Sequence, residues 1–216
     1  MSSSWFEHNF ALDDTLFRRV LAAGLERGGD HCDLFFQQRA INVIGLEDNE
    51  VNRAYRSVNL GVGIRVVAGE ATGYAFCEEL EPGPMLEAAR VAAAIARSDA
   101  APGPQRIEPV PGQDLYRVQR GWADVSVEER LPLLTRINER AFAADPRITK
   151  VRARLSDSET HILVVDSEGR KTWDYQPMTG LFAFCVAQDG DRREENDFTT
   201  GGRHGFEYYS PERVDE

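Results

Sequence analysis

The side chains that could bind a metal ion are spread thinly along this sequence. It contains four histidines: His8, His31, His161 and His204. None forms an HExxH, HExxxH or HxH pattern, the spacings that place two ligands on one face of a helix or strand. The one local group of donors is His31-Cys32-Asp33, where strand alternation would let His31 and Asp33, but not Cys32, share an ion. The start of a strand explains the same residues, so we predict no metal ligands here.

Nucleophilic catalysis has no candidate either. The sequence has no G-x-S-x-G turn, which presents the serine of an α/β-hydrolase. Cys77 is followed by Glu78 and Glu79, whose charge raises a thiol pKa and so disfavours the reactive thiolate. We therefore predict no catalytic residue. The three cysteines lack CxxC spacing, and we expect reduced, buried thiols: Cys32, Cys77 and Cys185.

Glycines supply the first candidate binding residues. Gly61 and Gly63 lie inside a run that alternates like a strand, so they are not the phosphate-binding turn of a dinucleotide site. Glycine inside a strand allows a bend or the close approach of another backbone. Either the helix expected over residues 84–98 packs on this face, or the bare backbone contacts a peptide-like ligand.

A second candidate is the segment Gly201-Gly202-Arg203-His204, which reads as a flexible loop. Its guanidinium and imidazole could bind a carboxylate or line a cleft. The same residues could instead form a solvated connection to a following domain, and the sequence favours neither reading.

The first 98 residues predict two helices around a group of strands. Apolar residues recur at helical spacing over 16–25, after Asp13 and Asp14, and alanines form one stripe over 84–98. Between them, the runs 34–38, 40–46, 51–58, 60–67 and 71–77 favour strands, with a hairpin turn at 68–70. Trp5 and Phe6 either pack on the first helix or dock a partner.

The second half repeats this pattern after a connector. Residues 99–124 contain four of the ten prolines and read as extended chain. Ser126 and Glu129 form a capping box for a helix that ends at Asp145-Pro146. Strands are expected over 151–155, 161–165, 171–176, 180–187 and 192–199, the last two joined at Asp189-Gly190.

We therefore predict an α+β fold of two helix-plus-antiparallel-sheet halves joined by a Pro-rich connector. The expected organisation is an N-terminal domain over 1–98, a connector over 99–124 and a second α+β segment over 125–209. Ser210, Pro211 and Glu212 begin a further helix with only four residues remaining. We expect residues 210–216 to lead into another domain of a longer protein.

The net charge of the chain limits the classes of partner that it is expected to bind. Asp and Glu number 36 against 25 Lys and Arg, which gives a net charge of −11 and a pI of about 4.9. Nucleic acids and anionic membranes bind proteins through clustered cations. Because no segment of this sequence carries a long run of Lys and Arg, we expect neither as a partner. No apolar run approaches the roughly 20 residues that span a bilayer, and the N-terminus lacks signal-peptide character. We expect a cytoplasmic protein.

Four segments together resemble one known family. They are GVGIRVVAGEATGYAFCEEL (61–80), VSVEERLPLL (125–134), DPRITKVRARLSD (145–157) and TTGGRHGFEYY (199–209). The chain resembles the N-terminal region of the TldD branch of the TldD/PmbA family, also called modulators of DNA gyrase.

This resemblance implies a zinc metallopeptidase that acts on peptides or unfolded segments. It also implies pairing of a TldD-type subunit with a PmbA-type partner or with a second copy. The zinc motif of the family is HExxxH, which this sequence lacks, so no catalytic residue is carried over. We expect residues 210–216 to lead into the catalytic domain, and the present segment to be inactive alone, to enclose the cleft and to aid subunit pairing.

Two other readings remain. The chain could be a stand-alone peptide-binding or assembly module without protease activity. Direct action on DNA gyrase, as the older family name suggests, is disfavoured by the excess of acidic residues.

Overall fold

The computed structural model describes residues 4–96, 103–112 and 115–215. The α-helices are α1 (Trp5–Asn9), α2 (Asp14–Leu25), α3 (Pro82–Ile95), α4 (Val127–Ala144) and α5 (Pro211–Asp215), with 3-10 helices η1 (Trp122–Asp124) and η2 (Phe206–Tyr208). The strands are β1 (His31–Glu47), β2 (Glu50–Ala68), β3 (Ala71–Cys77), β4 (Glu108–Pro109), β5 (Ile148–Asp166), β6 (Arg170–Asp189) and β7 (Arg192–Gly202).

The strands form one sheet in the order β3-β2-β1-β5-β6-β4, with β7 also paired to β6. The β2–β3 and β6–β7 hairpins are antiparallel, and β4 adds a two-residue parallel bridge to β6. The predicted α+β class is confirmed. Strands from both halves of the sequence join the same sheet, because β1 neighbours β5.

The predicted short strands are parts of much longer ones. The separate runs 34–38 and 40–46 are one strand, β1, and 51–58 and 60–67 are β2. The same holds for β5 and β6. Isolated polar residues between apolar runs do not interrupt backbone pairing, so these predicted breaks were wrong. The real turns use left-handed backbone at Asp48, Asn49, Gly69, Gly169 and Gly190.

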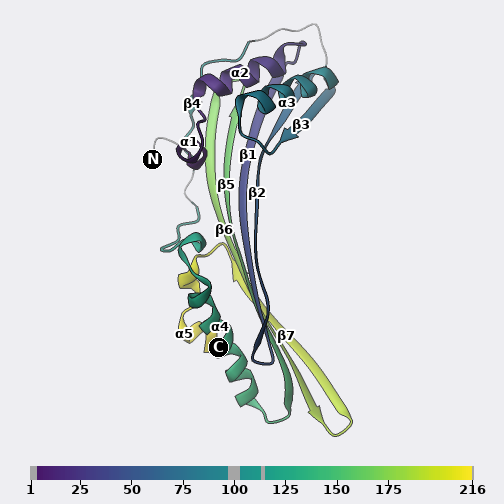
Figure 1. The fold of residues 1–216 in the computed structure, drawn as a ribbon, viewed down its shortest axis with the longest axis vertical. Helices are drawn as coiled ribbons and strands as arrows, with labels where there is room; N and C mark the ends of the chain where they lie inside the picture. Colours follow the sequence, from purple (N-terminus) through teal and green to yellow (C-terminus); the bar gives the residue numbers. More distant parts are fainter. Residues whose placement is uncertain (1–3, 97–102, 113–114, 216) are drawn as a thin grey trace. The chain divides into compact units, whose positions relative to one another are not determined.

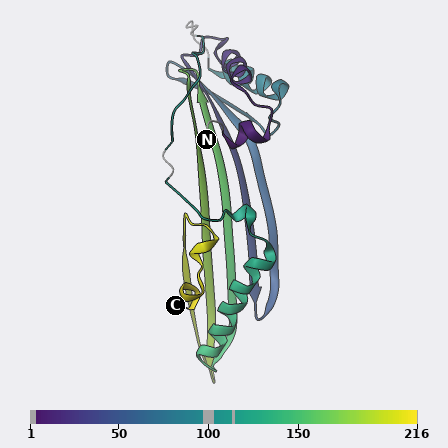
Figure 2. The same ribbon diagram turned by 90° about the vertical axis from the view of Figure 1, so that its left-hand side faces the viewer.

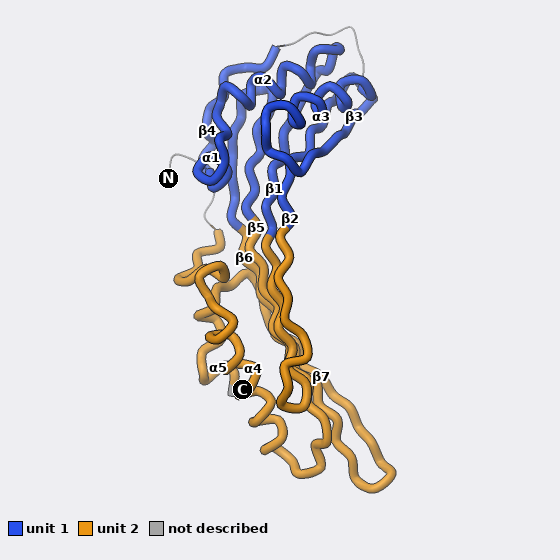
Figure 3. The backbone as a smooth tube through the Cα atoms, viewed as in Figure 1, with its two compact units in different colours: residues 1–39, 59–114, 161–175 blue, residues 40–58, 115–160, 176–216 orange. Residues whose placement is uncertain are grey.

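The chain divides into two compact units (Figure 3). Unit 1 contains residues 1–39, 59–114 and 161–175, and unit 2 contains 40–58, 115–160 and 176–216. Each unit takes segments from both sides of the Pro-rich stretch. The bounds of these units differ from the ranges 1–98 and 125–209, which stay a prediction of the domain organisation.

Unit 1 packs helices against one face of its strands. Figure 1 shows α2 and α3 side by side, and the two helices are in contact. The side chain of Asp13 accepts the Leu16 N–H at 2.7 Å and caps α2, as predicted. Phe17 of α2 lies edge-on to Phe36 of β1, with ring centroids 5.5 Å apart, and both are fully buried.

The N-terminal aromatics belong to this core. Ser4 and Glu7 form a capping box that starts α1, and Phe6 is fully buried. Trp5 stacks on His161 at 4.7 Å. Packing, rather than an open docking role, therefore accounts for Trp5 and Phe6.

A buried cation ties α1 and α2 to the sheet in unit 1. The Lys171 ammonium lies 2.8 Å from Glu7 Oε1 and 2.9 Å from Asp14 Oδ1, with its side chain 5% exposed. The two carboxylates offset the free-energy cost of burying this positive charge. Glu7 therefore stabilises both its own helix and its attachment to β6.

Unit 2 packs α4 along its strands (Figure 2). The predicted capping box of Ser126 and Glu129 is present. Leu133 and Leu134 of α4 bury against a group from the strands: Ile44, Leu46, Ala153, Leu155 and Leu181.

The described parts of the predicted connector are built into the units. Ile107, just before β4, is buried in the core of unit 1, and Trp122 of η1 is buried in unit 2. Residues 97–102 and 113–114 lie outside the described residues. Within the ranges that are described, no helix has the length and apolarity needed to cross a membrane.

Gly73 provides a test of the α3–β3 packing. A Cβ at this position would collide with the carbonyl oxygen of Ala92 in α3. We expect Gly73→Ala to lower the free energy of unfolding by about 2 kcal/mol, because backbone must move to admit the methyl group. Urea denaturation measures this.

The matched control is Gly83→Ala at the start of α3, where an added Cβ meets nothing within 4 Å. This variant is expected to be neutral or more stable by up to about 1 kcal/mol. Equal denaturation midpoints for Gly73→Ala and the wild-type chain would contradict the packing described.

Candidate functional site

An open groove lies on the face of the unit 1 strands that carries Gly61 and Gly63. The two glycines line it together with Phe35, Tyr74 and Phe76, which are 40%, 57% and 68% exposed. Its volume is about 250 Å³. The groove thus combines bare backbone with exposed aromatic rings, a composition suited to a peptide or an apolar side chain.

Strand alternation explains how the sequence builds this groove. Val62 and Ile64 point into the core, so Gly61 and Gly63 face the other way. A Cβ on Gly63 would meet the Tyr74 hydroxyl, and one on Gly61 would lie 2.9 Å from the Cys77 carbonyl oxygen. Glycine at both positions therefore lets β3 and the Tyr74 ring approach β2 closely.

The predicted helix does not pack on these glycines. It lies against Gly73, whose absent Cβ would meet the backbone of Ala92. That reading of Gly61 and Gly63 was wrong, because the helix covers the opposite face of the hairpin. Contact of their backbone with a peptide stays a prediction.

The Cys77 thiol borders the groove. Burial raises its pKa, and the charge of Glu79 raises it further. The direction predicted from Glu78 and Glu79 is confirmed, with burial as the larger cause. Burial and the charge of Asp33 together raise the pKa of Cys32 to about 12.

The second candidate segment is folded into unit 2. Gly201 and Gly202 end β7 and pair with Gly180 and Thr179 of β6. A Cβ on Gly201 would collide with the Thr179 carbonyl oxygen. The absent side chain of Gly201 therefore permits a close strand pair, whereas a Cβ on Gly202 would meet the His204 ring. Both glycines belong to β7, so the predicted flexible loop was wrong for them.

Arg203 and His204 make aromatic contacts. The Arg203 guanidinium lies over the Tyr116 ring at 4.6 Å, and His204 stacks on Tyr208 at 4.2 Å. The His204 carbonyl also accepts the Trp122 indole N–H at 2.8 Å. The Arg203 side chain and the His204 carbonyl thus attach the segment that follows β7 to Tyr116 and Trp122, while the His204 ring packs on Tyr208 within that segment. A role in binding a carboxylate stays a prediction.

The sequence did not indicate a buried charged cluster in unit 2. Arg130 of α4 faces Asp157 of β5, with Nε and Oδ2 3.4 Å apart and side chains 5% and 1% exposed. Asn42 donates to Asp157 at 2.7 Å. The Glu159 carboxylate accepts the backbone N–H groups of Trp122 and of the next residue, each at 2.8 Å. These partners lie far apart in sequence, so no local pattern could have found them.

This cluster has a structural role. Glu159 caps the first turn of η1, and Arg130 donates to the Trp122 carbonyl at 2.6 Å. The adjoining cavity has a volume of about 40 Å³, too small for a peptide side chain. Burial raises the pKa of Asp157 to about 6, outweighing the hydrogen bond from Asn42 and the charge of Arg130, which lower it.

The histidines do not gather into a metal site. Asp33 accepts the Arg65 Nε–H at 2.7 Å and lies 3.5 Å from His31, whose other nitrogen is 3.5 Å from Glu168. Across the part of the chain that the structure describes, no three His, Cys, Asp or Glu side chains are arranged to hold a metal ion. His31 and Asp33 therefore belong to a polar group with Arg65 and Glu168.

Comparison with known proteins identifies two matching family models. The model of the PmbA/TldA metallopeptidase domain 1 matches residues 32–98, and that of the PmbA/TldA metallopeptidase central domain matches residues 120–216. Together they include both glycine-containing candidate segments.

Curated relatives are described as metalloprotease TldD homologs. The protein from Haemophilus influenzae is 26% identical over 185 residues, which cover 85% of this chain and 38% of the relative. One from Buchnera aphidicola subsp. Schizaphis graminum is 27% identical over 184 residues, covering 83% and 37%. The chain thus spans less than two fifths of the length of these relatives.

Solved structures share the fold. A proposed modulator of a DNA gyrase from Thermotoga maritima aligns with a TM-score of 0.73 and 18% identity, over 93% of this chain and 45% of that one. TldE from Thermococcus kodakarensis aligns with a TM-score of 0.64 and 16% identity, over 87% and 43%.

The buried carboxyl of Asp157 makes a testable contribution to pH dependence. Its pKa rises from an ordinary value of 3.8 to about 6 on folding. Between these values the folded chain binds more protons than the unfolded chain, so stability falls as pH rises from about 4 to 6. We expect the free energy of unfolding of Asp157→Asn to decrease by up to about 3 kcal/mol less over this pH range than that of the wild-type chain.

Urea denaturation at several pH values measures the slope of the free energy of unfolding against pH. Asp145→Asn is the control, because the Arg147 ion pair lowers the Asp145 pKa to about 2, outside this window. Identical slopes between pH 4 and 6 for the wild-type chain and Asp157→Asn would contradict the assignment.

Proposed function

The chain belongs to the PmbA/TldD metallopeptidase family, and from that premise we propose that it is the non-catalytic N-terminal part of a TldD-like zinc metallopeptidase. The whole protein would hydrolyse peptides or unfolded protein segments. In this proposal the present chain shapes the substrate cleft and contributes to subunit pairing.

One observation carries the proposal. The two matching models are those of domain 1 and the central domain, and the relatives are more than twice as long as this chain. The HExxxH motif implied by the resemblance is absent from the sequence, since none of the four histidines is followed by glutamate. We infer that residues outside this chain supply the zinc ligands.

The side chains that the structure describes do not fit a zinc site. Asp33 is paired with Arg65, the His161 ring stacks on Trp5, and the His204 ring stacks on Tyr208. Aromatic stacking and ion pairing give these groups structural roles, which supports a scaffold rather than a metal centre. No catalytic step is assigned to any residue of this chain.

Subunit pairing finds support in an exposed stretch of β2. Every residue over 50–59 is exposed, including Val51, Tyr55 and Val58 at 49%, 51% and 52%. Exposed apolar side chains on a strand favour association. We propose either a PmbA-type partner subunit or a second copy as the occupant. We also propose a cytoplasmic location without a nucleic-acid partner, in keeping with the net charge of −11.

Metal analysis tests the proposal directly. We expect the purified 216-residue chain to retain far less than one zinc per chain after dialysis and to hydrolyse no unfolded peptide, with or without added zinc. Elemental mass spectrometry and a peptide-release assay measure the two properties. One tightly bound zinc per chain, with hydrolysis abolished by a chelator, would refute it.

The coding sequence beyond Glu216 distinguishes the two readings of the chain. An HExxxH motif there supports the metallopeptidase. A stop codon directly after Glu216 would favour a stand-alone peptide-binding or assembly module instead.

A further inference from the structure

We propose that the open edge of β3 binds an extended peptide segment that is apolar at its centre and basic at its ends. The inference rests on the proposed function in taking a peptide as the ligand. It goes further by naming the strand and the chemistry that select it.

The first support is the position of β3 in the sheet. β3 pairs with β2 from Val62↔Cys77 to Ala68↔Ala71. Among the strands that the structure describes, β2 is its single neighbour. An edge strand offers unpaired N–H and C=O groups, to which an extended peptide can add as a further strand.

Apolar side chains flank this edge on the face of the groove. Tyr74 and Phe76 of β3 are 57% and 68% exposed, and Phe35 lies beside them in the groove. Alternate side chains of an added strand would point to this face. They would cover aromatic surface that water now contacts.

The other face of β3 carries α3, which contributes exposed apolar residues of its own. Val91 and Ile95, one helical turn apart, are 48% and 57% exposed. Arg90 lies 3.9 Å from Glu26 at the end of α2, and successive helical residues turn by about 100°. Val91 and Ile95 therefore point away from α2, so the remaining side chains of an added strand would also find apolar partners.

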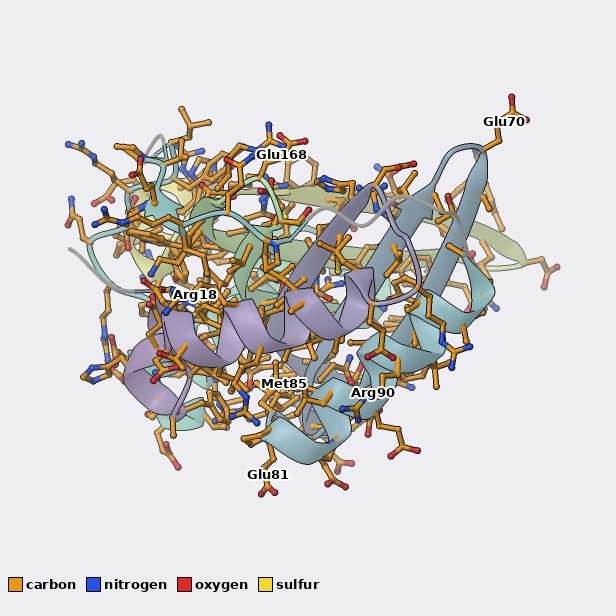
Figure 4. The ribbon with its side chains drawn as sticks, turned by 90° about the horizontal axis from the view of Figure 1, so that it is seen from above. Arg18, Glu70, Glu81, Met85, Arg90 and Glu168 are labelled. Carbon is orange, nitrogen blue, oxygen red and sulfur yellow. The ribbon has the colours of Figure 1, made fainter. Side chains whose placement is uncertain are left out.

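The segment that forms and flanks β3 carries only negative charges of its own, although Arg65 of β2 pairs across the strands with Tyr74. Residues 66–89 contain no lysine or arginine and five glutamates: Glu70, Glu78, Glu79, Glu81 and Glu87. Figure 4 shows Glu70 at the tip of the β2–β3 hairpin and Glu81 at the start of α3. The nearest cations in sequence, Arg65 and Arg90, are paired with Asp33 and Glu26. A ligand with lysines at both ends complements this field.

The same charges argue against a second copy of the chain at this edge. In the register centred on Tyr74, which pairs the whole of β3, antiparallel pairing with β3 of another copy would set Ala71 opposite Cys77 and so bring Glu70 near Glu78 of the other copy. Like charges placed opposite each other destabilise a strand pair. A basic peptide is therefore the occupant that the edge favours.

Fluorescence anisotropy with labelled peptides tests this on the full 216-residue chain. The probe is Lys-Lys-Val-Thr-Val-Thr-Val-Lys-Lys. One control replaces every lysine with glutamate, and a second replaces the central valine with proline, which removes a backbone donor. We expect the lysine probe to bind at least about tenfold more tightly than either control, with affinity falling as salt is added.

Variants locate the site. Phe76→Ser should weaken binding of the lysine probe at least about fivefold, and Glu78→Gln with Glu79→Gln should reduce its salt dependence. Phe198→Ser is the matched control, because Phe198 is 67% exposed on β7 in unit 2. It should leave binding unchanged.

Equal binding of the lysine and glutamate probes, or equal losses in Phe76→Ser and Phe198→Ser, would overturn the proposal. So would a chain that sediments as a dimer and becomes monomeric in Phe76→Ser, because a second copy would then occupy the edge. The zinc measurement is independent of these outcomes. Failure of the peptide-binding proposal can therefore be distinguished from failure of the proposed function.

Discussion

A sheet has two faces, and in each unit the helices bury one of them. In unit 1 the helical face holds the apolar core, with Phe17 against Phe36. The opposite face carries Gly61, Gly63 and exposed aromatic rings. This one-sided cover determines where a ligand can approach, because the helical side is closed by packing and the other side keeps its backbone and rings accessible. The edge of β3 is open for a separate reason, because no described strand continues the sheet beyond it.

Local patterns in the sequence predicted the parts of the fold that local chemistry decides. The capping box at Ser126 and Glu129 and the hairpins at Gly69 and Gly190 are present as expected. Strand length was not predictable in the same way, because backbone pairing with neighbours carries β1 and β2 through isolated polar residues. The start of α1 was missed although Ser4 and Glu7 repeat the Ser-x-x-Glu spacing, since one short turn leaves too few residues for a helical period.

The candidate site was also predictable from the sequence only in part. Alternation placed Gly61 and Gly63 on a strand face, but only the fold shows that Phe35 and Phe76 come beside them. The cluster of Arg130, Asp157 and Glu159 joins α4, β5 and η1 across long sequence separations, so no spacing rule reports it. The matching family models carry the name of a metallopeptidase, and the residues described in both units bury charged pairs and cap their helices.

Hydrogen–deuterium exchange of the isolated chain is the most direct measurement of the claim that β3 is an open edge. The account predicts that alternate amides over 71–77 exchange rapidly, because only those facing β2 are hydrogen-bonded, while amides over 62–68 of β2, which lies between β3 and β1, exchange slowly. Uniform slow exchange over 71–77 would contradict it, because some other segment or molecule would then already cover the edge.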